Sequence, residues 1–121
     1  MTPPAGGHGR LRRGPDITRV MRGPQQRAGR LLVTHVAPGP GGDDPSRVAV
    51  IASRKVGNAV TRNRCKRLLR EAVRHCALRP GIDVVLVARA ALASASLQVV
   101  QQELTTHLDE LGALAPVPTA G

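Results

Sequence analysis

The chain carries the sequence GNAVTRNRCKRLLRE at residues 57–71, which places five cationic side chains on little more than two helical turns. At 100° per residue, the polar and apolar side chains of this region separate onto opposing arcs of a helix. The polar arc holds Asn63, Lys66, Arg67, Arg70 and Arg74, and the apolar arc holds Cys65, Leu68, Leu69, Ala72, Val73 and Cys76. We therefore predict a helix that packs one face on a core and presents guanidinium groups outward, toward a phosphate backbone.

We predict that this helix spans residues 58–78, because Asn58 suits an N-cap and residues 80–81 form a stop signal. Strand patterns precede and follow it in the sequence. Residues 82–88 are almost continuously apolar, as in a central strand buried on both faces. Residues 31–37 and 47–53 read as two further strands. Because a flexible loop of Gly, Pro and Asp joins them, we expect these two strands to be antiparallel neighbours.

Two further helices complete the expected fold, at residues 15–22 and 96–111. The order helix, strand, strand, helix, strand, helix predicts an α+β protein, a small two-layer sandwich with the helices packed on one face of a mixed sheet. At 121 residues, the chain is long enough for one core. We expect a single RNA-binding domain at residues 10–111, between flexible tails at 1–9 and 112–121 that are rich in Pro, Gly and Ala.

The charge favours a nucleic-acid partner. The formal net charge is +10, and the basic residues concentrate in residues 1–30 and 47–79. A membrane surface is disfavoured because the chain has no Phe, Tyr or Trp to anchor it. Residues 1–30 contain no apolar run, so we expect no signal peptide and a cytoplasmic protein. Cys65 and Cys76 are too far apart on one helix to form a disulfide.

Patterns of a protein-borne active site are missing from the sequence. The four His and two Cys show no zinc-ligand spacing, and neither standard Gly-rich phosphate loop occurs. The adjacent acids, Asp43-Asp44 and Asp109-Glu110, are typical of solvated charge at a loop or a helix end. We therefore assign no catalytic residue and no metal ligand to the protein.

The run KVGNAVTRNRCKR at residues 55–67 closely resembles the signature of the bacterial ribonuclease P protein family. Residues 47–54 (RVAVIASR) resemble that family's second strand, and residues 11–13, 30–33 and 85–89 agree further, so the resemblance covers roughly residues 10–111. It implies the element order αβββαβα, with a left-handed βαβ crossover around the basic helix.

The resemblance also implies a function and a set of partners. The family's protein is the non-catalytic subunit of an endoribonuclease, and it binds ribonuclease P RNA and precursor tRNA. The 5′ leader is removed by a hydrolysis that depends on Mg²⁺ ions, held mainly by the RNA and the substrate. No membrane or small-molecule substrate is implied. The residues implied to bind the RNA subunit are Ser53, Arg54, Lys55, Arg62, Asn63, Arg64, Lys66, Arg67 and Arg70. The residues implied to line a cleft for the single-stranded leader are Arg12, Arg13, Ile17, Arg19, Met21, Val33, His35 and Arg89.

This chain departs from the family in that cleft. The family usually brings aromatic side chains to the leader, and the corresponding positions here appear as Ile17, Met21 and His35. Base–aromatic stacking contributes about 1–3 kcal/mol per base. We therefore expect leader binding to depend more on Arg than it does in relatives that carry the aromatic residues.

Two other classes of protein fit parts of the sequence. A general RNA-binding or ribosome-associated protein, without a role in tRNA 5′ processing, could use the same basic helix. A double-stranded DNA binder is disfavoured, because DNA readers usually pair the recognition helix with another helix across a tight turn, and strands flank it here.

Overall fold

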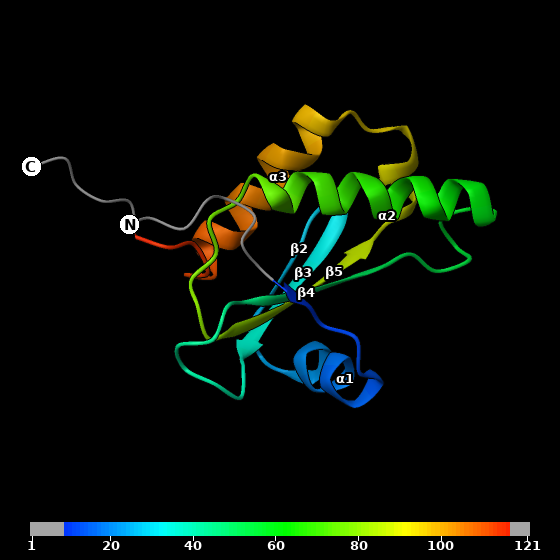
Figure 1. Cartoon of the computed structure of the whole chain (residues 1–121). Coiled ribbons are helices and arrows are strands. Elements are labelled where there is room, and N and C mark those ends of the chain that lie inside the picture. The colour runs from blue at the N-terminus through cyan, green and yellow to red at the C-terminus, as the bar shows by residue number, and fades with distance from the viewer. Residues whose placement is uncertain (1–8, 117–121) are drawn as a thin grey trace, which may run out of the picture.

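A five-stranded mixed sheet forms the centre of the computed structural model, which describes residues 9–116 (Figure 1). Its strands lie in the order β1-β4-β5-β3-β2. They span β1 (Gly9–Arg10), β2 (Gln26–Ala28), β3 (Leu32–Pro38), β4 (Arg47–Ile51) and β5 (Ile82–Ala88). As its apolar sequence indicates, β5 is the central strand.

The expected pairing of β3 with β4 is wrong, because β5 lies between them. β5 runs antiparallel to β3 from Leu32↔Ala88 to Pro38↔Ile82, and parallel to β4. A strand whose two faces are both apolar is most stable at the centre of a sheet, with a neighbour at each edge. β5 therefore lies between β3 and β4, although the loop that joins β3 to β4 suggested that they pair directly.

Three α-helices and one 3₁₀ turn connect the strands, namely α1 (Gly14–Arg22), α2 (Ala59–Arg74), η1 (Ala90–Ser94) and α3 (Leu97–Glu110). The Asn58 side chain caps α2 by accepting the Thr61 N–H at 2.9 Å, as predicted. α2 ends at Arg74 rather than Leu78, because Leu78 forms a β-bridge with Leu114. Apart from the short β1 and η1, the order is αβββαβα, as the resemblance implies.

The helices cover both faces of the sheet, so the prediction that they share one face is wrong. α2 and α3 lie on one side, and α1 lies on the other (Figure 1). Side chains of β5 alternate between these two layers: Val84 and Leu86 join the core under α2 and α3, whereas Val85 joins the core under α1. Because both faces of β5 are apolar, both need a cover.

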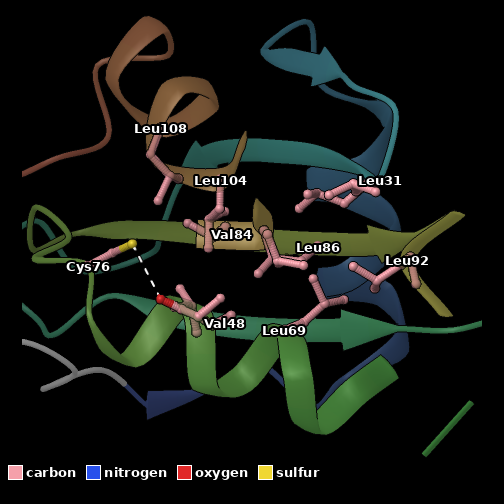
Figure 2. Packing of buried hydrophobic residues seen from close by; sticks show 14 of the residues in the cluster. Leu31, Val48, Leu69, Cys76, Val84, Leu86, Leu92, Leu104 and Leu108 are labelled. Atoms are coloured by element: carbon pink, nitrogen blue, oxygen red, sulfur yellow. Dashed lines mark hydrogen bonds between the residues drawn. The ribbon is translucent and has the colours of Figure 1, made fainter. Parts of the chain in front are cut away.

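The larger core lies between the sheet and the pair α2 and α3. Figure 2 shows Leu69 of α2 and Leu104 and Leu108 of α3 directed at Val84 and Leu86 of β5. All five side chains are fully buried. This core holds α2 in place by its apolar arc, so that the polar arc faces outward.

Residues 112–116, expected to begin a flexible tail, lie against the fold instead. The Ala113 side chain is fully buried, and the Ala115 N–H donates to the Ala77 carbonyl at 2.8 Å. Gly9, at the end of the other expected tail, pairs with Arg47 in the sheet. The remaining residues of both expected tails, 1–8 and 117–121, lie outside the described residues.

Cys65 and Cys76 are buried free thiols, although Cys76 lies just beyond the end of α2 and not, as expected, on the same helix as Cys65. Burial raises the pKa of both. Among the described helices, none combines the length and apolarity required to cross a bilayer.

Candidate nucleic-acid interface

The turn before α2 brings an exposed Ser53, Arg54 and Lys55 to the N-terminal end of the helix. Gly57 makes this turn possible: its φ is +153°, and an added Cβ would lie 2.9 Å from Thr61 Cγ2. The free N–H groups of a helix N-terminus attract anions, and these three residues lie next to that end.

The outer side of α2 is strongly cationic. Asn63, Arg64, Arg67 and Arg70 are exposed, whereas Arg62 and Lys66 are half-buried. The helix's one carboxylate, Glu71, pairs with Arg74 at 3.5 Å and with His75 at 3.3 Å. Within residues 9–116, the cations from Arg62 to Arg70 therefore have no carboxylate partner. Such a surface favours binding to a polyanion.

The Arg62 Nε–H is buried and has no hydrogen-bond partner among the described residues. A buried donor without an acceptor is uncommon in folded proteins. An acceptor supplied by a docked partner would satisfy it.

The residues assigned to the leader cleft lie on the other face of the sheet, with α1. Ile17 packs against the core beneath α1, and Met21 is exposed at 37%. Val33 and His35 lie on the same face of β3 as Ala37, which belongs to that core. The structure therefore brings these four leader-cleft residues, Ile17, Met21, Val33 and His35, to one face, opposite the basic side of α2.

His35 is only 6% exposed, and burial lowers the pKa of its imidazole. Its Nδ1 has no hydrogen-bond partner in the part of the chain that the structure describes. Burial therefore favours the neutral imidazole, and its buried Nδ1 is left without a partner inside the described fold.

Arg19 is held against the sheet rather than left free in the cleft. Its Nη1 donates to the Pro38 carbonyl at 2.8 Å, and its Nη2 donates to Asp83 at 2.5 Å. Asp83 is 1% exposed and also accepts two hydrogen bonds from Arg47, at 2.9 and 2.7 Å. Burial acts to raise the pKa of Asp83, but the bonds from Arg47 and Arg19 outweigh it and hold the pKa below its ordinary value. The leader role of Arg19 stays a prediction, because its guanidinium already pairs with Asp83 within the fold.

Arg12, Arg13 and Arg89 are exposed. The first two precede α1 directly, and Arg89 follows β5, where its Nη1 donates to the Gly29 carbonyl at 3.2 Å. They place positive charge at the start of α1 and at the end of β5.

A groove of about 550 Å³ lies between α2 and the sheet edge formed by β4 and β1. It is lined by Arg67, Arg70 and Arg74 of α2 and by Arg10 of β1. Arg74 lies on the polar arc of the helix but has no binding role predicted from the sequence, and no sequence pattern marks Arg10. A two-residue strand leaves no periodic signal, and the position of Arg10 depends on its pairing with Val48.

No three His, Cys, Asp or Glu side chains gather into a potential metal site within residues 9–116. The surfaces described above are cationic and apolar instead.

Comparisons with known proteins agree with this geometry. A model of the family Ribonuclease P matches residues 7–112. The Ribonuclease P protein component of Dehalococcoides mccartyi is 42% identical over 85 residues, which cover 70% of this chain and 69% of the relative. That of Herpetosiphon aurantiacus is 36% identical over 103 residues, which cover 84% and 82%.

Solved structures show the same fold. The RNase P protein of Staphylococcus aureus aligns with a TM-score of 0.74 at 25% identity, covering 88% of this chain and 97% of the other. The RNase P protein of Thermotoga maritima aligns with a TM-score of 0.72 at 25% identity, covering 85% and 97%.

Proposed function

We propose that this chain, which belongs to the bacterial ribonuclease P protein family, assists a catalytic RNA in removing the 5′ leader of precursor tRNA. Membership of the family makes it a protein component of a tRNA-processing ribonucleoprotein. The observation that supports the rest of the proposal is the cationic side of α2, whose side chains from Arg62 to Arg70 have no carboxylate partner within residues 9–116, on a helix whose apolar side packs into the core.

The RNA subunit is assigned to the α2 side. Arg62, Arg64, Arg67 and the turn at residues 53–55 present cations around a helix N-terminus, a combination suited to phosphates. Each phosphate that they neutralise releases counterions, so this contact should be strongly salt-dependent.

The leader is assigned to the α1 side, where Ile17, Met21, Val33 and His35 share a face. Because the sheet separates this face from α2, one protein can contact the RNA subunit and the leader at the same time. The two contacts together would increase the affinity of the complex for precursor tRNA. Neither contact requires the protein to supply a nucleophile.

Hydrolysis is assigned to Mg²⁺ held by the RNA subunit and the substrate, where the ion activates water and stabilises the developing charge. The protein's residues contribute by positioning the leader and by neutralising phosphates. A neutral His35 can hydrogen-bond to a base without adding a charge.

The test is cleavage of a labelled precursor tRNA at a few mM Mg²⁺. A bacterial ribonuclease P RNA is assayed alone, together with this protein, and the protein is assayed by itself. We expect slow cleavage by the RNA alone, none by the protein alone, and rapid cleavage at the mature 5′ end by the mixture.

Failure to stimulate the RNA, together with equal binding of leader-bearing and leaderless tRNA, would instead support a general RNA-binding protein. Cleavage by the protein alone would overturn the assignment of the chemistry to RNA.

A further inference from the structure

The groove between α2 and the sheet edge has two cationic walls. One wall is the side of α2 that carries Arg67 and Arg70, and the other is Arg10 on β1. Arg10 faces α2 because it pairs with Val48, whose side chain belongs to the core under α2, and paired residues in a sheet point to the same face. β1 therefore places a charge across the groove from the basic helix.

The floor of the groove is apolar. Val48 and Val50 of β4 and Val73 of α2 line it, and Val50 gives most of the exposed apolar surface because Val48 and Val73 are buried in the core. A groove with cationic walls and an apolar floor differs from the open helix face, which offers charge alone. Its volume of about 550 Å³ lies in the range of sites that hold small organic ligands.

The charges in the groove are available to an anion. Glu71 also lines it, but this carboxylate pairs with Arg74 and His75. Arg10, Arg67 and Arg70 form no ion pair with any carboxylate of residues 9–116. Three cations thus surround an apolar floor without an internal counter-charge.

We propose that this groove binds an unpaired nucleotide of an RNA strand, with its flanking phosphates between Arg10 and the arginines of α2 and its base or ribose on the valine floor. An intact duplex does not fit this description, because the faces of its bases are stacked inside and a protein reaches mainly its phosphates and 2′-hydroxyls. An unpaired nucleotide offers both charge and an apolar face. The inference rests on the proposed function, since it adds a single-stranded contact to the RNA-binding side of α2.

Arg10→Ala tests the groove, with Arg79→Ala as the matched control. Both residues are exposed arginines, and we place Arg79 in no interface. The full-length proteins are titrated with a labelled eight-nucleotide oligouridylate, followed by fluorescence anisotropy. We expect Arg10→Ala to weaken binding about 3–10-fold and to lower the salt slope by about 0.7, the value for one phosphate on a single strand. Arg79→Ala should change affinity less than about twofold.

Backbone amide NMR locates the contact. On addition of the oligouridylate, the amides of Val48, Val50 and Arg10 should shift in the wild type and shift much less in Arg10→Ala. A blunt RNA duplex of similar charge should leave the valine amides unshifted. Circular dichroism checks that both variants fold, and Arg10→Gln provides a second variant that keeps the length of the side chain.

Equal losses in Arg10→Ala and Arg79→Ala, or valine shifts of the same size with the duplex, would overturn the groove. If such a result accompanies normal stimulation of ribonuclease P RNA, only the proposal of a nucleotide site in the groove is overturned, and the proposed function stands. A protein that does not stimulate the RNA but still shows Arg10-dependent oligouridylate binding would overturn the proposed function and leave the groove.

Discussion

Asp83 joins three parts of the fold through one buried carboxylate. It lies in the central strand, receives Arg47 from β4 and Arg19 from α1, and Arg19 also reaches the Pro38 carbonyl at the end of β3. Arg47 in turn lies 4.0 Å from Asp16 of α1. These bonds hold α1 against the sheet, so they determine the geometry of the face assigned to the leader.

Asp83→Asn should destabilise the protein by about 1–3 kcal/mol, because it weakens the hydrogen bonds from two partly exposed guanidinium groups to a buried side chain. Arg19→Ala should also lower the free energy of unfolding, measured by urea denaturation. Arg22→Ala, at the exposed end of the same helix, is the control and should have little effect. If Arg19→Ala keeps full stability and loses only RNA affinity, Arg19 serves RNA rather than the fold.

The titration of buried side chains makes stability depend on pH. Burial lowers the pKa of His35 and, against the opposing carboxylates Glu103 and Glu110, the pKa of His107. The unfolded chain therefore binds more protons than the folded chain as pH falls through the ordinary histidine range near 6.5, and stability decreases there. The lowered pKa of Asp83 adds a second loss, as pH falls through the carboxyl range near 4.

Urea unfolding at pH 7.5 and 5.5 measures the first of these losses. We expect the wild type to be less stable at pH 5.5, and His107→Gln to show a smaller difference between the two pH values. Glutamine is chosen because it retains a polar partner for Thr34, whose Oγ1 lies 2.9 Å from His107 Nδ1. An unchanged difference in His107→Gln would contradict the assigned origin.

At the scale of elements, α3 fixes the turn between β2 and β3. The Glu103 carboxylate accepts the backbone N–H groups of Arg30, Leu31 and Leu32 at 2.9–3.1 Å. An added Cβ at Gly29 would lie 2.5 Å from the carboxylate, so a larger residue there would displace the Glu103 side chain. One side chain of α3 thereby satisfies three donors of a turn more than seventy residues away.

Glu103→Ala should reduce stability by about 1–3 kcal/mol, because it removes the acceptor of these three N–H groups. Glu110→Ala is the matched control: its carboxylate forms an exposed ion pair with Arg27 at 2.9 Å, so its loss should cost less than about 1 kcal/mol. Thermal unfolding of the two variants measures the difference. Equal effects would show that the turn does not depend on Glu103.

The sequence predicts most elements of this fold but not their arrangement. Apolar periodicity and the caps Asn58 and Ser96 locate the principal helices and strands. β2 has the sequence QRA with all three residues exposed, so no hydrophobic pattern marks it. The side of the sheet that α1 covers depends on long-range packing, although a central strand apolar on both faces already indicated that both needed cover.

The candidate site divides in the same way. The helical period groups the cations of α2 correctly, because their placement is local. The partner of Arg19 is Asp83, sixty-four positions away in the chain, and nothing in the local sequence identifies that pair. The position of Arg10 beside α2 likewise depends on sheet pairing.

At the scale of the whole molecule, the sheet keeps two surfaces apart, each assigned to a different RNA. The α2 surface can therefore be altered without changing the α1 surface. Replacing Arg62, Arg64 and Arg67 together with Ala should weaken assembly with ribonuclease P RNA and slow cleavage at low Mg²⁺, with partial recovery at high Mg²⁺. The recovery follows because a divalent ion can replace some of the lost phosphate neutralisation.

Leu104→Ala is the control for that triple variant. Its side chain is fully buried in the core, so the change should lower stability by about 2–5 kcal/mol and reduce activity only in proportion to unfolding. Circular dichroism and cleavage assays separate the two cases. Unfolding of the triple arginine variant would show that the basic face supports the fold rather than RNA binding.

The absence of aromatic residues concerns the molecule as a whole, since the chain has none. Binding of single-stranded leader RNA should therefore depend more steeply on salt than in relatives whose leader cleft contains aromatic residues. Affinities measured between 50 and 200 mM salt for this protein and one such relative test the expectation. A slope no steeper than that of the relative would contradict it.

The central position of β5 has a consequence for biosynthesis. β3 and β4 leave the ribosome first, yet β5, to which both are hydrogen-bonded, is encoded after the entire basic helix. Until β5 has emerged, one edge of β3 and one edge of β4 lack the strand that pairs with them in the fold. Assembly of the sheet must therefore wait until the central strand has been translated.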